Sequence, residues 1–293
     1  MTRPRVLVVD DSVVVRRLVS RALEQDGSVE VVGVAADGQI ALTKIAQTKP
    51  DLVVLDVEMP VMDGLTALAE IRMRWPRLPV IVFSTLTVRG AEVTLEALAR
   101  GASDYVPKPS RGGDPAENLA RIREELVPRI FALCPSAAGH RHLEGIRPAA
   151  RPPTAQVPAP SRLEPRARVD VVAIGASTGG PTALAELLPA LPAALPVPIV
   201  IVQHMPPLFT GFLAERLDGR SALHVAEASN GDPLAPGGVL IAPGGRHIVV
   251  EPTGDGYRVR THRGPPENSC RPPWTRFFDP SPTPSARVPW RSS

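Results

Sequence analysis

One short stretch of the sequence could carry nucleophilic chemistry. VVAIGASTGGP, residues 171–181, places Ser177 between glycines after an apolar run. A G-x-S-x-G segment at a strand-to-helix turn exposes the serine hydroxyl, and the following helix offers amide donors. His204 ends the next apolar run, VPIVIVQHM (197–205), where its imidazole could accept the hydroxyl proton as a general base. Ser177 and His204 are therefore the candidate catalytic pair.

Other interpretations of Ser177 compete with catalysis. A dinucleotide-binding loop requires G-x-G-x-x-G, and Ser177 stands where the second glycine should be; a P-loop requires a lysine that is absent here. Serine is also a favoured helix N-cap, which is the structural alternative. The separation from His204 (204 minus 177, or 27 residues) fits one strand–helix–strand crossover. That crossover would bring both side chains to one sheet edge, which favours catalysis.

A second group of side chains lies at the ends of apolar runs in the first half of the chain. It consists of Asp10 and Asp11 after RVLVV, Asp56 in DLVVLD, Ser84 in PVIVFS and Lys108 in DYVPKP. The carboxyl ends of parallel strands share one edge, so these groups should converge. Crowded carboxylates repel unless a cation compensates them, and Mg²⁺ with phosphate oxygens as co-ligands fits this set. A carboxylate could then attack a phosphoryl group. Solvated acids at strand ends are the structural alternative, which the ordered set disfavours.

Alternating strand and helix patterns must position both groups. The strand segments are continuous apolar runs, typical of parallel strands covered on both faces. Five strand–helix units in the first part predict a doubly wound parallel sheet, and a second αβ pattern follows. The expected strands are 5–10, 30–35, 51–56, 79–84, 104–109, 169–177, 197–205 and the segments GGVLIAP and RHIVVEP; the expected helices are 13–25, 38–47, 116–133 and 180–191.

Composition divides the 293 residues and excludes several classes of protein. Residues 134–168 are rich in Pro, Ala and Arg without sustained periodicity, which predicts an extended linker between two domains. The net charge of +3 comes from scattered basic residues without interleaved aromatic residues, so we expect no nucleic-acid binding. No apolar run approaches about 18 residues, and the N-terminus lacks the pattern of a signal peptide. Only two cysteines are present, Cys134 and Cys270, which favours the cytoplasm.

The first half resembles the receiver domain of two-component response regulators. The resemblance rests on VLVVDDS, VVLDVEMPVMDG, VFSTLT and DYVPKP and covers residue 4 to about 125. It implies a flavodoxin-like domain in which Asp56 accepts the phosphoryl group. Mg²⁺ would be held by Asp11, Asp56 and the backbone carbonyl of Glu58, with support from Asp10. The resemblance also makes Ser84 the switch hydroxyl and Lys108 the phosphate-pairing lysine, and it places Tyr105 at the aromatic switch position, with core packing as the alternative.

The second half resembles the chemotaxis protein-glutamate methylesterases, in which a receiver domain precedes the esterase. IGASTGGP, QHMPPLFTGFLAERL, GDPLAPGGVLIAPGG and GPPENSCRP carry this resemblance over residues 169 to about 272. It implies that Ser177 is the nucleophile and His204 the base, with no cofactor for the esterase step. The family removes methyl esters from receptor glutamates and deamidates particular receptor glutamines. Its partners are the chemotaxis histidine kinase and the methyl-accepting receptors, and no membrane insertion is implied.

The last residues depart from that family. After Arg271 and Pro272 comes PWTRFFDPSPTPSARVPWRSS, with Asp279 as its only acid, whereas the family supplies its triad aspartate from a later loop. Read two bases out of frame, the codons of Trp274 and Thr275 contain GAC, an aspartate codon, and family members carry Ser-Val-Asp at this place. We therefore expect a misframed or truncated end from about residue 273, an incomplete Rossmann-like esterase domain and weak or no esterase activity. DNA sequence across codons 268–293 tests this, and an intact frame without a family-like continuation in either alternative frame contradicts it.

The expected organisation is thus two doubly wound α/β domains. We predict a receiver at 1–133, a linker at 134–168, an esterase domain at 169–272 and an aberrant tail at 273–293. The leading functional hypothesis is a phosphorylation-activated receptor methylesterase. The alternative is a non-catalytic phosphoacceptor module that competes for the kinase. A transcription regulator is weaker, because no helix-turn-helix pattern follows the receiver.

Overall fold

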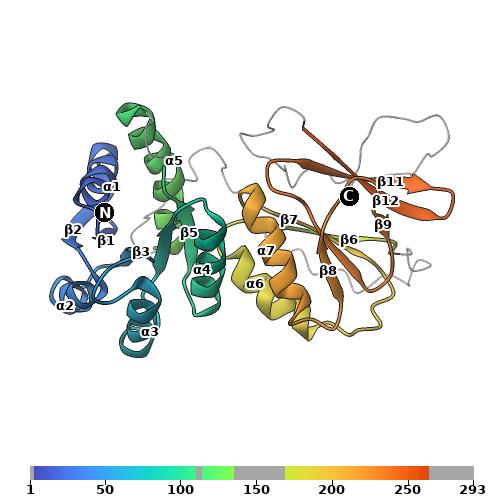
Figure 1. Cartoon of the computed structure of the whole chain (residues 1–293), viewed down its shortest axis with the longest axis horizontal. Coiled ribbons are helices and arrows are strands. Elements are labelled where there is room, and N and C mark those ends of the chain that lie inside the picture. The colour runs from blue at the N-terminus through green and yellow to red at the C-terminus, as the bar shows by residue number, and fades with distance from the viewer. Residues whose placement is uncertain (1–2, 110–113, 135–168, 264–293) are drawn as a thin grey trace, which may run out of the picture. The chain divides into compact units, whose positions relative to one another are not determined.

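The computed structural model describes residues 3–109, 114–134 and 169–263, which form two compact units (Figure 1). Each unit is built around a parallel sheet, which confirms the predicted α/β class. Of the predicted linker at 134–168 only Cys134 is described, and the tail at 273–293 lies outside the described residues. Among the residues described, no helix combines the length and the apolarity that crossing a bilayer requires.

The first unit is a five-stranded parallel sheet with strand order β2-β1-β3-β4-β5. Helices α1 and α5 pack together on one face and α2, α3 and α4 cover the other (Figure 1). The elements are β1 (Arg5–Val9), α1 (Val13–Asp26), β2 (Glu30–Ala35), α2 (Gly38–Thr48), β3 (Leu52–Asp56), α3 (Gly64–Arg74), β4 (Val80–Ser84), α4 (Val88–Ala99), β5 (Asp104–Pro107) and α5 (Pro115–Leu133).

Local sequence explains where these elements begin and why they pack. Each of the helices α1 to α5 follows a side chain that accepts a backbone N–H bond, which offsets unpaired donors of the first turn. These caps are Ser12, Asp37, Asp63, Thr87 and Asp114. All residues of β3 and β4 are buried, as their uninterrupted apolar runs predict for central strands.

The second unit contains a four-stranded parallel sheet of order β6-β7-β10-β8 and an antiparallel sheet of order β11-β12-β9. The antiparallel sheet packs on one face of the parallel sheet, where Val200 and Val202 meet Ile248 and Val259. The elements of this part of the chain are β6 (Val172–Ala176), α6 (Gly180–Leu187), the 3₁₀ helix η2 (Leu188–Ala190), β7 (Ile199–Gln203), α7 (Pro207–Asp218), β8 (His224–Glu227), β9 (Pro233–Leu234), β10 (Gly238–Ile241), β11 (His247–Thr253) and β12 (Gly256–His262).

Two sequence expectations differ from this part of the fold. The helix predicted over 180–191 ends at Leu187, because Pro189 has no N–H for an α-helical bond and the chain continues as the short helix η2. The segments GGVLIAP and RHIVVEP form strands as predicted, but β10 joins the parallel sheet whereas β11 pairs with β12. The antiparallel sheet was not expected from the sequence.

The Cys134 thiol is predicted to resist alkylation in the folded protein. Cys134 is buried at the end of α5, and burial, with Asp51 nearby, raises the pKa of its thiol to about 11. The thiolate is the nucleophile, and a pKa of about 11 in place of 9.0 makes the fraction of Cys134 present as thiolate at pH 8 about 100-fold smaller. Iodoacetamide labelling read by peptide mass spectrometry checks this, with guanidinium-unfolded protein as the control. Equal rates in the folded and unfolded protein would contradict the prediction.

Candidate functional site

The acidic group predicted from the sequence assembles at one edge of the first sheet. Asp10 and Asp11 follow β1, and Asp56 ends β3. The carboxylate oxygens of these residues, one from each, lie within 4.8 Å of one another. From α1, the Arg16 guanidinium donates to the carbonyls of Asp10 (2.5 Å) and Asp11 (2.9 Å), which holds the main chain of the acidic pair. Sequence reasoning missed Arg16.

Lys108 joins two of these acids. Its ammonium lies 2.8 Å from an oxygen of Asp10 and 2.7 Å from an oxygen of Asp56, both of which are buried. The other oxygen of Asp56 accepts the N–H groups of Val57 (2.7 Å) and Glu58 (3.3 Å). Burial raises the pKa of Asp56 to about 6, although the bond to Lys108 opposes that shift. Burial by itself lowers the pKa of Lys108, and the pairing with Asp10 and Asp56 outweighs it, so the pKa is raised.

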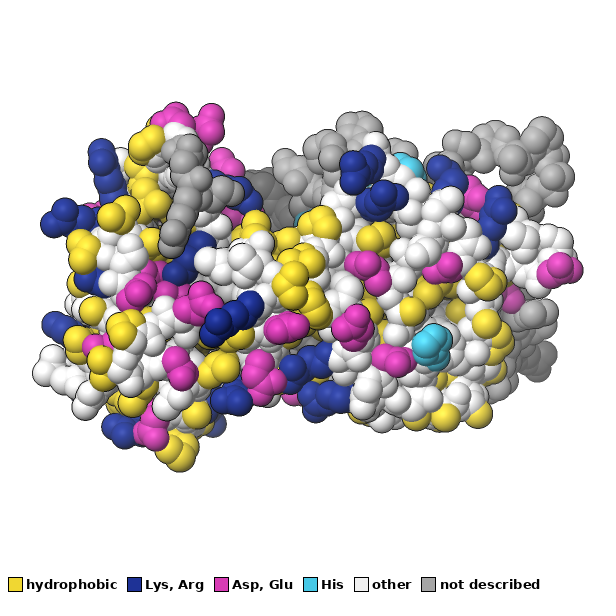
Figure 2. All heavy atoms as spheres, in the orientation of Figure 1, with side chains coloured by type: hydrophobic (Ala, Val, Ile, Leu, Met, Phe, Trp, Pro, Cys, Tyr) yellow, Lys and Arg dark blue, Asp and Glu magenta, His cyan; other side chains and the backbone are white. Residues whose placement is uncertain are grey.

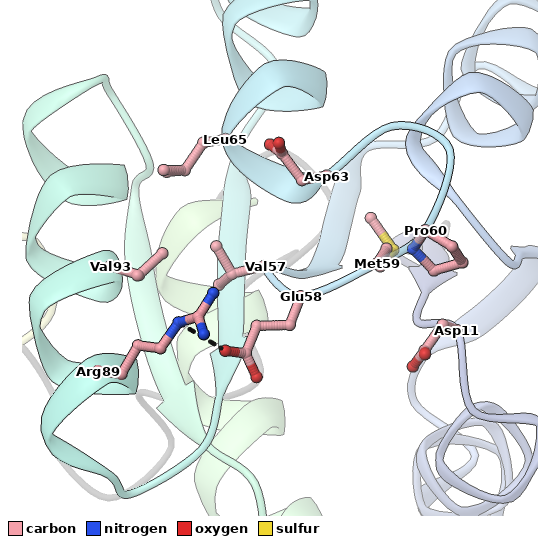
Figure 3. Close-up of a pocket in the computed structure, with 9 residues that line it drawn as sticks. All are labelled: Asp11, Val57, Glu58, Met59, Pro60, Asp63, Leu65, Arg89 and Val93. Atoms are coloured by element: carbon pink, nitrogen blue, oxygen red, sulfur yellow. Dashed lines mark ion pairs between the residues drawn. The ribbon is translucent and has the colours of Figure 1, made fainter.

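These residues fit a hard divalent cation. Three carboxylates lie together here, and two of them, those of Asp10 and Asp56, pair with the Lys108 ammonium. The carboxylates offer oxygen atoms, the ligands that Mg²⁺ prefers. A pocket of about 420 Å³ beside them is lined by Asp11 and Glu58 among others (Figure 3). The Glu58 carboxylate turns toward Arg89 of α4, at 3.5 Å, and away from Asp11. The Glu58 carboxylate is thus engaged by Arg89, and the Glu58 carbonyl stays a predicted metal ligand.

The remaining predicted groups of the first unit lie beside this edge. Ser84 ends β4 next to β5, and its carbonyl accepts the Lys108 N–H at 2.7 Å. The buried Ser84 hydroxyl donates to the carbonyl of Gly90 at 3.2 Å, so it is held by the first turn of α4. Tyr105 is 4% exposed, and burial raises the pKa of its phenol. The structure therefore places Tyr105 in the core, where the packing alternative put it.

Gly64→Ala is predicted to impair phosphoacceptor function by displacing the backbone. A Cβ at Gly64 would stand 2.1 Å from the Asp56 carbonyl oxygen and 2.7 Å from the Cα of Val57. Because the backbone of Asp56 must move, we expect at least about a tenfold loss of phosphotransfer and about 2 kcal/mol of destabilisation. Gly33→Ala is the matched control, since its Cβ would meet only side-chain carbons, of Leu7 at 3.4 Å and of Lys44 at 3.9 Å. Equal phosphotransfer in the two variants would refute this role of Gly64.

Ser177 and His204 lie at the ends of two paired strands in the second unit. In the β6–β7 pair, Ala176 is the register partner of Gln203, and Ser177 and His204 follow directly. The His204 N–H donates to the Ala176 carbonyl at 3.2 Å. Neighbouring parallel strands lie about 4.8 Å apart, so the two side chains begin within reach of each other. Ser177 is exposed and His204 half-buried, which suits a nucleophile open to substrate and a base that the protein holds.

The turn after Ser177 separates two interpretations of the glycine-rich stretch. Helix α6 begins at Gly180, and the carbonyl of Gly179 accepts its first bond, from Ala183. Gly179 is therefore the N-cap, and the N-cap interpretation of Ser177 is wrong. Gly179 has a φ of 75°, and nothing lies within 4 Å of where its Cβ would stand. Backbone conformation explains this glycine, because other residues rarely adopt a positive φ.

Sequence reasoning missed two buried polar residues of the second unit, Gln203 and Thr210. Gln203, the last residue of β7, is buried and donates from its side-chain amide to the carbonyl of Ser177 at 3.1 Å. Thr210 of α7 is also buried; its hydroxyl donates to Glu227 at the end of β8 and accepts the Gly244 N–H at 3.0 Å. A polar residue inside the apolar run PIVIVQ was the signal for Gln203. For Thr210 the sequence offers no comparable signal.

Both parts of the chain match models of known protein families. A model described as "Response regulator receiver domain" matches residues 6–120, and one described as "CheB methylesterase" matches residues 172–281. A protein-glutamate methylesterase/protein-glutamine glutaminase of Nocardioides sp. is 50% identical over 268 residues, which cover 92% of this chain and 72% of that protein. The chain belongs to the CheB methylesterase family. A Trichodesmium erythraeum protein of the same name is 46% identical over 273 residues, covering 93% of this chain and 76% of its own length.

Solved structures of the same family are also similar to the two parts of the chain. The receiver domain of Thermotoga maritima CheB is 36% identical, with a TM-score of 0.41; the match covers 45% of this chain and 97% of that domain. The catalytic domain of Thermotoga maritima CheB methylesterase is 42% identical, with a TM-score of 0.35, and covers 37% of this chain. This chain spans 57% of the length of that catalytic domain.

Membership of the CheB methylesterase family confirms the resemblance seen in the sequence, including the order of receiver and esterase. The family is one of carboxylic ester hydrolases that carry a response-regulator receiver. The match to the esterase model extends to residue 281, beyond the boundary of 272 predicted from the sequence. The domain limits and the roles of individual site residues stay predictions. Asp279 lies outside the described residues.

Proposed function

We propose that this chain is a phosphorylation-controlled hydrolase that removes methyl esters from methyl-glutamate residues of chemotaxis receptors and deamidates receptor glutamines. The observation that carries the proposal is the placement of Ser177 and His204 on adjacent strand ends, in a chain that also gathers three carboxylates and Lys108 at one edge of its first sheet. The chemotaxis histidine kinase and the methyl-accepting receptors are the proposed partners, and the cytoplasm is the proposed compartment. Family membership supports each of these assignments.

In the receiver, Asp56 is the proposed phosphoacceptor. Its carboxylate oxygen attacks the phosphorus of the phosphohistidine and the P–N bond breaks, which leaves an acyl phosphate on Asp56 and returns the imidazole to the kinase. Lys108, already 2.7 Å from Asp56, pairs with the transferred group. Mg²⁺ held by Asp11, Asp56 and the carbonyl of Glu58 would neutralise charge on the phosphoryl oxygens. Release of the Ser84 hydroxyl from Gly90 would let it turn toward the phosphoryl group.

In the esterase, Ser177 attacks the methyl ester of the receptor glutamate. Its Oγ bonds to the ester carbon while the hydroxyl proton passes to the imidazole of His204. The carbon–oxygen bond then breaks, methanol leaves with that proton, and a glutamyl ester remains on Ser177. Water, deprotonated by His204, hydrolyses this ester and restores the serine. Amide N–H groups at the start of α6 are the proposed donors to the oxyanion, and no cofactor enters the reaction.

The expected rate for the 293-residue chain is low. In a triad, the acid fixes the tautomer of the histidine and stabilises its charged form, and its loss costs about 10⁴ in kcat. The residues after Pro272 contain Asp279 as their only acid, and it is followed by proline in a segment without strand or helix periodicity. We therefore propose that Ser177 and His204 act without a well-placed acid in this chain.

Methanol release from methylated receptors tests the proposed function. The chain is incubated with receptor-containing membranes carrying labelled methyl groups, with and without a phosphodonor such as acetyl phosphate. Slow release that phosphodonor accelerates is the expected result. Release at the rate of a full-length relative would contradict the proposed absence of the triad acid. No release above that of the Ser177→Ala variant would exclude esterase function.

The second candidate function is a phosphoacceptor module without catalysis that competes for the kinase. It is favoured by one observation, the contrast between the two sites. The described residues supply the whole proposed acidic edge with its paired lysine, whereas the acid expected for the esterase is not among them. Phosphotransfer to Asp56 without any methanol release would establish this alternative.

A further inference from the structure

The side chain of Gln203 lies at the junction of the two catalytic strand ends. Gln203 is the last residue of β7 and is 1% exposed. By strand alternation it shares a face with Ile199 and Ile201, opposite to Val200 and Val202, which pack on the antiparallel sheet. A carboxamide buried among apolar side chains is unfavourable unless it is hydrogen-bonded. The hydrogen bonds of the Gln203 side chain therefore indicate its role.

The amide nitrogen of Gln203 bridges the main chains of both proposed catalytic residues. Nε2 lies 3.1 Å from the carbonyl oxygen of Ser177 and 3.4 Å from that of His204, and donates to both. The bond from the His204 N–H to the Ala176 carbonyl closes the backbone ladder. Beyond that bond the two strands diverge: β6 continues into the turn before α6, and β7 continues toward α7. A primary amide has two N–H groups, which suits two carbonyl acceptors at this divergence.

We propose that Gln203 is a positioning residue that holds the Ser177 turn in register with His204. The proposal rests on the roles proposed above for that pair. Proton transfer requires the hydroxyl and the imidazole within about 3.2 Å, and a displacement of about 1 Å can cost 10²-fold in rate. Among the described residues, the Oε1 of Gln203 has no hydrogen-bond partner. The two donated bonds must therefore offset the burial of an unpaired acceptor, as expected where a side chain serves a site.

Substitutions at Gln203 separate this role from simple core packing. Gln203→Met keeps the length and volume of the side chain and removes both donors. Gln203→Glu keeps the shape but points an oxygen at two carbonyls, and it supplies the same comparison if the methionine variant fails to fold. Ile201→Val is the matched control, since Ile201 is a buried residue on the same face of β7 that makes no such bond, and the change lowers stability modestly.

Reaction of Ser177 with a fluorophosphonate probe, measured on the full chain, reports the geometry of the pair. Ser177→Ala defines the background, and melting temperatures report folding. We expect labelling to fall about 10- to 100-fold in Gln203→Met and to stay unchanged in Ile201→Val. Labelling of Gln203→Met at the wild-type rate overturns the proposal. An equal loss in Ile201→Val also overturns it, because strand stability would then set the reactivity.

Hydrogen exchange keeps the inference testable if the wild-type chain is not labelled. Labelling no greater than in Ser177→Ala would exclude Ser177 as an activated nucleophile, which is a failure of the proposed function. The exchange of the amides from Ser177 to Gly180 would then be compared among the variants. Exchange at least about tenfold faster in Gln203→Met, but not in Ile201→Val, supports the bridge between the two strand ends. Unchanged exchange in Gln203→Met contradicts it.

Discussion

Replacing Asp56 with asparagine is expected to abolish phosphotransfer to this chain. The carboxamide keeps the shape of the side chain but is a far weaker nucleophile than a carboxylate, and it cannot form a stable acyl phosphate. Asparagine also removes one of the charges that Lys108 pairs with at 2.7 Å. We expect no radiolabel above background after incubation with phosphorylated kinase or acetyl [³²P]phosphate, and no acceleration of methanol release by phosphodonor.

Asp63→Asn is the matched control for Asp56→Asn. Asp63 is an exposed carboxylate of the same loop and the N-cap of α3, where it accepts the N–H of Thr66 at 2.8 Å. Asparagine caps helices about as well as aspartate, so this control removes one negative charge from the same edge without disturbing the helix. It should be phosphorylated at the wild-type rate. Labelled Asp56→Asn protein would show that another residue accepts the phosphoryl group.

The second large effect is expected at Ser177, and its size reports on the triad. In a serine protease, removal of the nucleophile costs about 10⁶ in kcat, whereas removal of the acid alone costs about 10⁴. If this chain already lacks a well-placed acid, the rate is already lower by about 10⁴, so Ser177→Ala can remove only the remaining factor of about 10². We therefore expect methanol release to fall by about 10²-fold in Ser177→Ala, measured with phosphodonor present.

Thr178→Ala is the control for Ser177→Ala, because it removes the neighbouring hydroxyl from the same turn and should retain most of the activity. A loss near 10⁶-fold in Ser177→Ala would show that a residue of this chain orients His204, and the proposal of an absent acid would then be wrong. Equal losses in the two variants would instead assign the effect to the conformation of the turn.

On the face shown in Figure 2, acidic and basic side chains are interspersed with hydrophobic ones. Of the large hydrophobic side chains that are exposed, Val61 is notable because its φ is 65°, which is unfavourable for a β-branched residue. It lies in the loop between Asp56 and α3, so the strain is local to the proposed phosphoacceptor edge.

The sequence by itself determined the parallel strands and the residues that end them. Uninterrupted apolar runs such as DLVVLD and VPIVIVQHM identify buried strands, and the residue at the end of such a run must lie at the sheet edge. For this reason the apolar runs alone are enough to place Asp56, Lys108, Ser177 and His204 at sheet edges. The strand assignments of the first unit agree with the structure to within one or two residues. These features depend on short-range patterns, which a single sequence contains.

Only the tertiary structure decided how the edges are held. The antiparallel pairing of β11 with β12, the order of β8 and β10, and the closeness of Gly64 to Asp56 all depend on contacts that leave no periodicity in the sequence. The same is true of the Arg16 and Gln203 side chains, which bond to backbone carbonyls beside the two sites. A donor can be recognised from its residue type, but its acceptor is set by packing, because burial and direction determine which carbonyl it reaches.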